Sequence, residues 1–170
     1  MKTLVVGLGN PILTDDGVGV KVAYAVEEAL RSQTSLRSLT SGDDITVTEA
    51  SVGGLRLMEL MVGYDRVIII DAIIHPNGNK HKAGTIFQMS QQDLEDISLT
   101  QHSASAHDTT LNTALDMAAR MGLHLPKEVL IFAVEVEEIF VFSDEPTPAV
   151  AAAIPKVTEM VLEELRISSA

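Results

Sequence analysis

The chain has 170 residues, of which 46% are hydrophobic, and its 24 acidic and 12 basic side chains give a formal net charge of −12. This size suffices for one buried core, and no linker or repeat divides the sequence, so we expect a single domain spanning residues 1–170. The acidic balance argues against nucleic acid as the main partner, because phosphate contact needs clustered Lys and Arg. The sequence holds no cysteine, which excludes disulfides and thiolate chemistry, so any metal must be held by oxygen and imidazole ligands.

No apolar run in the sequence approaches the length needed to span a membrane. The chain also enters a predicted strand directly, without a basic segment and a long apolar run before it. We therefore expect a cytoplasmic protein with no membrane partner. No exposed apolar helix face is obvious, so we expect a monomer.

The first predicted unit is a strand, a loop and a helix. An apolar strand at residues 3–6 leads into a Gly-Leu-Gly-Asn-Pro loop and then two adjacent carboxylates, Asp15 and Asp16. An amphipathic helix is predicted over residues 15–31, because apolar side chains recur there at helical spacing. Such a unit puts its loop at the carboxyl edge of a parallel sheet, where open α/β folds place their sites.

Strands and helices alternate along the rest of the chain. Further strands are predicted at residues 45–50, 66–70, 85–89 and 128–135, and further helices after Gly53-Gly54, from about Leu111 to Gly122, and from Thr147-Pro148 onward. No helical crossover precedes the strand at 85–89, so it should be antiparallel and at an edge. Pro155 should kink or restart the last helix. This alternation predicts an α/β fold of three layers, α/β/α, around a twisted, mostly parallel sheet of about five strands.

The glycines of the first loop favour a tight turn over a nucleotide site. A dinucleotide fingerprint needs a third glycine where this chain has Ile12, and no Walker-type loop is present. Gly7 and Gly9 are therefore interpreted as shaping the turn between strand and loop. We expect no organic cofactor.

Three carboxylates are candidates for chemistry. At a helix start, Asp15 or Asp16 can satisfy free backbone N–H groups, but only one of two adjacent acids can cap while the other faces the sheet edge. We expect Asp15 to cap and Asp16 to face the edge. Asp71 follows the buried strand at 66–70, so it should meet Asp16 there. Two such acids suit a hard cation or an acid–base pair.

A histidine is expected to join the two carboxylates. Three of the five histidines fall in loops or turns, where we expect surface positions: His75, His81 and His124. His107 is followed at Leu111 by the first apolar position of a predicted helix, so its side chain should belong to the first turn of that helix. That turn should open at the same edge as Asp16 and Asp71. Two oxygens and one nitrogen suit nickel, zinc or iron, and the residues alone do not choose among them.

Three motifs resemble one known family over nearly the whole chain. They are Val-Val-Gly-Leu-Gly-Asn-Pro-Ile-Leu-Thr-Asp-Asp-Gly-Val-Gly at 5–19, Ile-Ile-Asp-Ala ending at Ala72, and Ser-Ala-His ending at His107. In this order and at these separations they are similar to the maturation endopeptidases of [NiFe]-hydrogenases. The resemblance implies a phosphorylase/hydrolase-like α/β/α fold. It also implies an aspartic-type peptidase that removes the C-terminal extension of the hydrogenase large-subunit precursor after nickel is loaded.

The resemblance carries the family's metal-contacting positions onto Asp16, Asp71 and His107. The nickel would belong to the precursor, and the peptidase would contact it without storing it. Weak retention by an oxygen and nitrogen site would leave the metal with the cysteine-bearing precursor.

One departure and two alternatives remain. Many family members carry an Asp-Gly-Gly type turn after the second strand, where this chain has Glu49-Ala50-Ser51-Val52-Gly53-Gly54, which leaves the role of Glu49 open. The first loop also resembles peptidyl-tRNA hydrolase, so an esterase of that kind is one alternative, although the acidic charge opposes a tRNA substrate. A non-catalytic metal-binding chaperone that docks on the precursor is the other.

Overall fold

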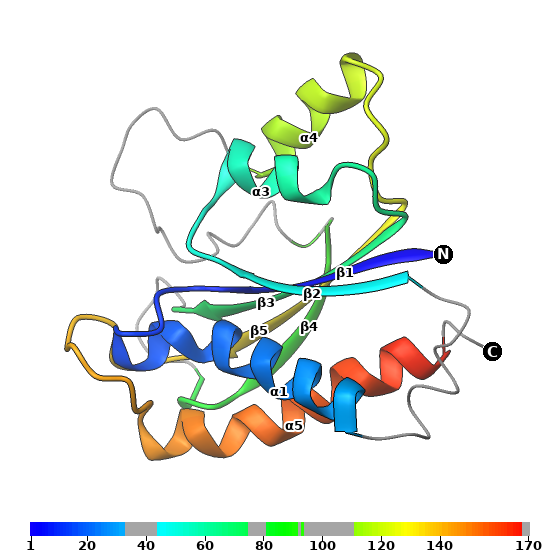
Figure 1. Ribbon diagram of the computed structural model, residues 1–170. Helices are drawn as coiled ribbons and strands as arrows, with labels where there is room; N and C mark the ends of the chain where they lie inside the picture. Colours follow the sequence, from blue (N-terminus) through cyan, green and yellow to red (C-terminus); the bar gives the residue numbers. More distant parts are fainter. Residues whose placement is uncertain (33–43, 75–80, 92, 94–110, 168–170) are drawn as a thin grey trace.

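A computed structural model describes residues 1–32, 44–74, 81–91, 93 and 111–167. In this part of the chain five strands form one sheet in the order β2-β1-β3-β5-β4 (Figure 1). They are β1 (Lys2–Leu8), β2 (Asp44–Ala50), β3 (Arg66–Ile73), β4 (Ile86–Ser90) and β5 (Glu128–Glu135). All neighbours are parallel except β4, which runs antiparallel to β5 at one edge. The mostly parallel sheet and its antiparallel edge strand confirm the predicted fold class.

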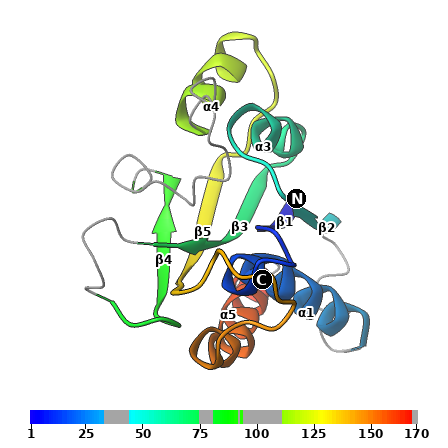
Figure 2. The ribbon, with the colours of Figure 1, turned by 90° about the vertical axis from the view of Figure 1, so that its left-hand side faces the viewer.

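Helices cover both faces of the sheet (Figure 2). A 3₁₀ turn, η1 (Thr14–Gly17), leads into α1 (Val18–Ser32), which packs beside α5 (Pro148–Ile167) on one face. The other face carries α3 (Gly54–Met61) and α4 (Leu111–Arg120), which pack on each other. The α5 helix continues through Pro155 as one element, so the predicted restart is wrong. Among the described residues, no helix is long and apolar enough to cross a membrane.

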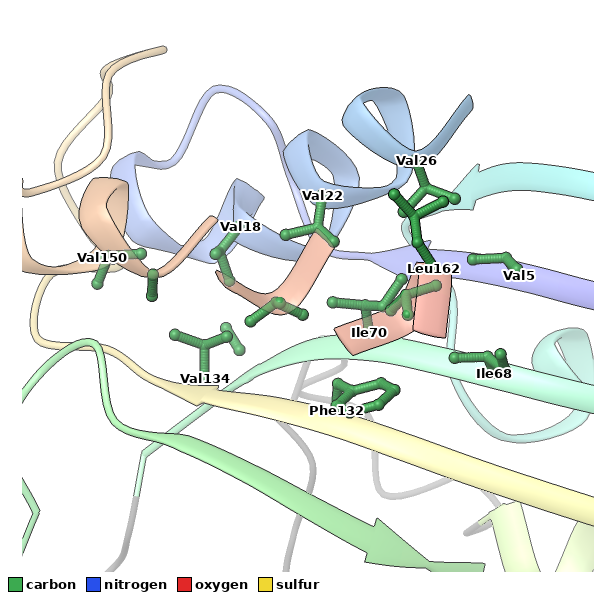
Figure 3. Close-up of a cluster of buried hydrophobic side chains, with 14 of the residues drawn as sticks. Val5, Val18, Val22, Val26, Ile68, Ile70, Phe132, Val134, Val150 and Leu162 are labelled. Carbon is green, nitrogen blue, oxygen red and sulfur yellow. The ribbon is translucent and has the colours of Figure 1, made fainter. Parts of the chain in front are cut away.

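The sheet separates two hydrophobic clusters. One lies between the sheet and the pair α1 and α5, where Val18, Val22 and Val26 face the sheet at helical spacing (Figure 3). The other lies under α3 and α4. All eight residues of β3 are buried, because alternate side chains enter the two clusters and both edges of the strand are paired. The strand that bears Asp71 is therefore the most enclosed part of the sheet.

Two predicted boundaries are wrong at the site. The helix starts at Val18 rather than residue 15, because Asp15 and Asp16 belong to the preceding 3₁₀ turn. The strand expected at 66–70, with Asp71 directly after it, continues to Ile73, since its pairing with β5 extends that far. Asp71 thus lies inside a hydrogen-bonded strand, which fixes its backbone more firmly than a loop position would.

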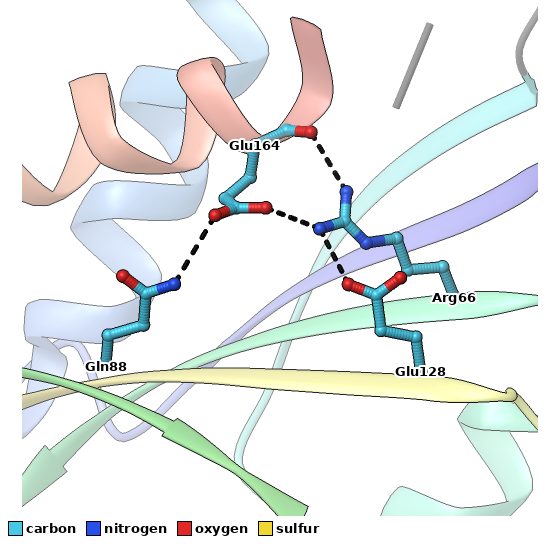
Figure 4. Close-up of polar contacts among 4 residues, drawn as sticks. All are labelled: Arg66, Gln88, Glu128 and Glu164. Atoms are coloured by element: carbon cyan, nitrogen blue, oxygen red, sulfur yellow. Dashed lines mark hydrogen bonds and ion pairs between the residues drawn. The ribbon is translucent and has the colours of Figure 1, made fainter. Parts of the chain in front are cut away.

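A buried arginine ties the last helix to the opposite end of β3 (Figure 4). The Arg66 side chain is 3% exposed, and its Nη2 lies 2.6 Å from Glu164 Oε2 on α5 and 2.9 Å from Glu128 Oε1 on β5. Its Nη1 donates to the Glu164 carbonyl oxygen at 3.0 Å, and Gln88 Nε2 donates to Glu164 Oε1 at 3.3 Å. A buried guanidinium requires such partners, because an uncompensated buried charge is strongly destabilising.

We expect Glu164→Ala to lower the free energy of unfolding by about 1–3 kcal/mol, because it removes a charged hydrogen-bond partner from buried Arg66. Urea denaturation measures the change. The matched control is Glu163→Ala, the exposed neighbour on the same helix, which should cost less than about 0.5 kcal/mol. Equal losses in the two variants would show that the ion pair does not stabilise the fold.

Candidate active site

Glycines let the first helix press directly onto the sheet. A Cβ on Gly19 would collide with the carbonyl oxygens of Leu8 and Ile70, and one on Gly7 would collide with the carbonyl oxygen of Gly19. Gly9 has φ +128°, a conformation that other residues rarely adopt. The glycines therefore shape the turn, as the sequence predicted. They also allow close packing that brings the start of α1 to the carboxyl ends of β1 and β3.

Asp16 lies in this turn and is only 3% exposed. Its Oδ2 accepts a hydrogen bond from the backbone N–H of Asn10 at 2.7 Å, which ties the carboxylate to the loop after β1. The 3₁₀ turn that holds Asp16 packs against β3. Thr14, at the start of the turn, has φ +42°, which is strained for a β-branched residue. Strain of this kind persists only where surrounding contacts enforce it.

Asp71 is 1% exposed, and its Oδ1 accepts a hydrogen bond from the Ala72 amide at 2.8 Å. It is in register with Ala133 of β5, which belongs to the cluster under α3 and α4. Directly opposed residues of parallel strands share a sheet face, so Asp71 belongs to that face. Since β1 and β3 are neighbours, Asp16 and Asp71 occur at the carboxyl ends of adjacent strands.

His107 lies outside the described residues, as do His75 and His102. The α4 helix begins at Leu111 on the sheet face to which Asp71 belongs. Within the described part of the chain, no three His, Cys, Asp or Glu side chains form a group able to hold a metal ion. The trio of Asp16, Asp71 and His107 therefore remains a prediction.

Each of the two described histidines contacts another side chain. The His81 ring meets the Phe87 ring edge to face, with centroids 4.9 Å apart. The His124 Nε2 lies 3.1 Å from Asp65 Oδ1, and His124 is exposed. Neither of these contacts involves Asp16 or Asp71.

The predicted capping role of Asp15 is wrong. Its carboxylate is fully buried and accepts from the amides of Glu137 and Glu138 at 3.3 and 3.1 Å. It also accepts from the Thr147 amide at 2.7 Å and the Thr147 hydroxyl at 3.1 Å. Asp15 therefore holds the segment between β5 and α5, residues 136–147, instead of the start of its own helix. The carboxylate is used this way because the turn of Thr14–Gly17 directs it at a distant part of the chain.

Sequence reasoning missed two features at this edge of the sheet. Glu135 ends β5, is 1% exposed, and is in register with Ile73, two residues beyond Asp71. Asp71 was selected because it is an acidic residue at the end of a buried apolar run. Glu135 stands at the end of such a run too, so the same signal could have found it. The other feature is the segment 136–147 itself, whose contact with the first loop has no local sequence signal.

Glu49, whose role the sequence left open, lies on edge strand β2 opposite Gly7. It accepts a hydrogen bond from the Tyr24 hydroxyl on α1. This hydrogen bond raises the pKa of Tyr24 above its ordinary value, since it stabilises the protonated phenol. Beyond β2, Ser51 Oγ donates to the Gly9 carbonyl oxygen at 2.6 Å and so ties the turn after β2 to the first loop.

Comparisons with known proteins show the family of this chain. The family model described as hydrogenase maturation protease matches residues 20–164. The chain belongs to the hydrogenase maturation protease family. It is 31% identical over 172 residues to the hydrogenase 2 maturation protease of Escherichia coli strain K12, covering 99% of this chain and 93% of that protein.

Solved structures agree with this assignment. The chain resembles the hydrogenase maturating endopeptidase HybD from Escherichia coli with a TM-score of 0.71 at 27% identity. It resembles a solution structure of an endopeptidase from Escherichia coli with a TM-score of 0.73 at 28% identity. Each match covers 99% of this chain and 94% of the other. The members of this family are peptidases. The family assignment therefore disfavours the two alternative hypotheses, an esterase like peptidyl-tRNA hydrolase and a non-catalytic metal-binding chaperone.

We expect Asp15→Asn to destabilise the protease by about 3 kcal/mol. An amide NH₂ at either oxygen position would face donors of Glu137, Glu138 or Thr147 and leave them unsatisfied. Thermal unfolding of the variant measures the loss, with Asp144→Asn, an exposed carboxylate of the same segment, as the control. An Asp15 variant as stable as the control would contradict the role assigned to this carboxylate.

Proposed function

We propose that this chain is a cytoplasmic endopeptidase that removes the C-terminal extension of the nickel-loaded [NiFe]-hydrogenase large-subunit precursor. It acts as a single domain and as a monomer. The observation that carries the proposal is the pair of buried aspartates, Asp16 and Asp71, at the carboxyl ends of adjacent strands in a member of a peptidase family.

Asp16, Asp71 and His107 contact the nickel of the precursor. Nickel is substrate here, brought by the precursor and kept by it. The absence of cysteine from the chain supports the view that the nickel stays with the precursor. Carboxylate and imidazole ligands compete poorly for nickel with the thiolates of a cysteine-bearing precursor. Contact with nickel also makes cleavage conditional on a loaded precursor.

Two roles are open to the carboxylates in hydrolysis. In one, the substrate's nickel polarises the scissile carbonyl, and Asp16 and Asp71 hold the metal beside it. In the other, one carboxylate takes a proton from water, the hydroxyl adds to the carbonyl carbon, and the proton passes to the leaving amine as the C–N bond breaks. Both need the aspartates held rigidly. Their burial and their hydrogen bonds to the Asn10 and Ala72 amides support such rigidity.

We expect Asp71→Asn to reduce cleavage at least about 100-fold while precursor binding persists, because the amide keeps the acceptor for the Ala72 N–H but loses the charge. Mass spectrometry of the precursor measures tail loss, and co-elution measures binding. Asp116→Asn, on the exposed face of α4, is the control and should cleave normally. A fully active Asp71→Asn variant would exclude Asp71 from the chemistry.

We expect cleavage to require nickel in the precursor. Purified protease is incubated with precursor prepared with and without nickel, and the products are weighed. Removal of the C-terminal extension from the nickel-loaded precursor alone supports recognition of the metal. In that case the proposed contacts form only with the loaded substrate. Tail loss indifferent to nickel would remove that recognition but leave the peptidase assignment intact.

A further inference from the structure

Three consecutive apolar side chains are exposed to solvent in the segment between β5 and α5. Phe140 is 84% exposed, Val141 55% and Phe142 77%. Ile12, in the loop after β1, is 54% exposed. We call these four residues the apolar ledge. The chain has four phenylalanines, and two of them are exposed here. Burying an aromatic side chain is strongly favourable, so a cluster of exposed apolar side chains of this kind marks a surface that binds a partner.

The four residues of the ledge lie on two segments joined by hydrogen bonds. Leu13 and Ser143 form a parallel bridge, which sets Ile12 beside Phe142 along the two segments. The Ser143 amide donates to the Ile12 carbonyl oxygen at 3.0 Å, and the Thr14 amide donates to the Ser143 carbonyl oxygen at 2.9 Å. The ledge is therefore one surface built from two distant parts of the chain.

The backbone of the ledge is fixed. Glu138 Oε1 accepts from the amides of Phe140 and Val141 at 2.8 and 3.0 Å. The Thr14 hydroxyl donates to the Val141 carbonyl oxygen at 2.6 Å. Because the turn is preformed, a partner that covers the two phenyl rings gains apolar burial without first ordering this backbone.

The ledge is continuous with the turn that carries Asp16. The Asp16 amide donates to the Leu13 carbonyl oxygen at 2.9 Å, and Leu13 is the residue bridged to Ser143. In Figure 1 the orange segment before α5 approaches the blue start of α1 at this point. A peptide cleaved beside Asp16 therefore passes close to the ledge.

Acidic side chains flank the ledge. Glu137, Asp144 and Glu145 are exposed, and residues 136–147 contain no Lys or Arg. The nearby ammonium of Lys21 donates to the Asp144 carbonyl oxygen, not to these carboxylates. Such a border favours a partner whose apolar side chains are flanked by basic ones.

We propose that the apolar ledge docks the precursor segment next to the scissile bond, an extended stretch with apolar side chains flanked by Lys or Arg. Phe140 and Phe142 are its anchors, since exposed aromatic side chains on a rigid support are the usual centres of binding energy. The acidic border sets the orientation of the segment. This inference rests on the proposed function and adds to it the surface that selects the substrate.

The test compares Phe140→Ser/Phe142→Ser with Met121→Ser, a change at a side chain 71% exposed beside α4. Cleavage of nickel-loaded precursor gives KM and kcat, and circular dichroism verifies folding. The double variant should raise KM at least about tenfold with kcat kept, whereas Met121→Ser should match the parent. An unchanged KM in the double variant, or an equal rise in the control, overturns the docking surface and leaves the proposed function standing.

A second measurement does not need cleavage. The affinity for nickel-loaded precursor is measured in an Asp71→Asn background, with and without the two Phe substitutions. A loss of about tenfold or more supports the ledge even if the parent chain cleaves nothing, an outcome that would overturn only the proposed function. No binding by the parent, or equal affinity in both proteins, overturns the ledge. The docking proposal is also overturned if light scattering shows a dimer of this chain that the Phe140→Ser/Phe142→Ser substitutions dissociate, while the affinity for precursor stays the same.

The charged border has its own test. Glu137→Gln/Glu145→Gln should raise KM less than the Phe substitutions and should flatten the dependence of KM on ionic strength. An unchanged dependence on ionic strength overturns the basic character assigned to the partner.

Discussion

The carboxylate of Asp15 is the contact on which the site depends. It accepts from the Glu137, Glu138 and Thr147 amides and is fully buried. Through it the turn that carries Asp16 is joined to the segment before α5 and to the start of that helix. Because donors from so many positions meet one charge, the turn, the segment and the helix are fixed together. The two adjacent aspartates therefore make different contacts: Asp15 holds the segment before α5, and Asp16 accepts from the backbone N–H of Asn10 in the first loop.

The sheet supplies the rest of the geometry. β3 is buried on both faces and paired on both sides, so Asp71 lies on the most enclosed strand of the sheet. Glycines at positions 7 and 19 let α1 approach so closely that the turn before it packs against that strand. In the proposed function, these fixed elements hold Asp16 and Asp71 in place while the apolar ledge binds the precursor.

Local patterns predicted the fold well. The strand Glu128–Glu135 has the predicted bounds, because a continuous apolar run is a local signal. The strand predicted at 85–89 is observed as β4, Ile86–Ser90, and it is antiparallel at an edge as expected from the missing crossover. The partners of Asp15 lie 122 to 132 residues away, so no local pattern revealed them and capping was predicted instead. The ledge escaped notice for the same reason, since exposure of an apolar loop depends on what packs against it.

Nickel X-ray absorption tests the central claim most directly. Spectra are compared for nickel-loaded precursor, made uncleavable at its processing site, alone and in complex with the protease. The account predicts that complex formation adds oxygen and nitrogen ligands to the nickel, and that a protease with Asp16→Ala and Asp71→Ala adds fewer. A nickel spectrum unchanged by a protease that demonstrably binds the precursor would contradict it.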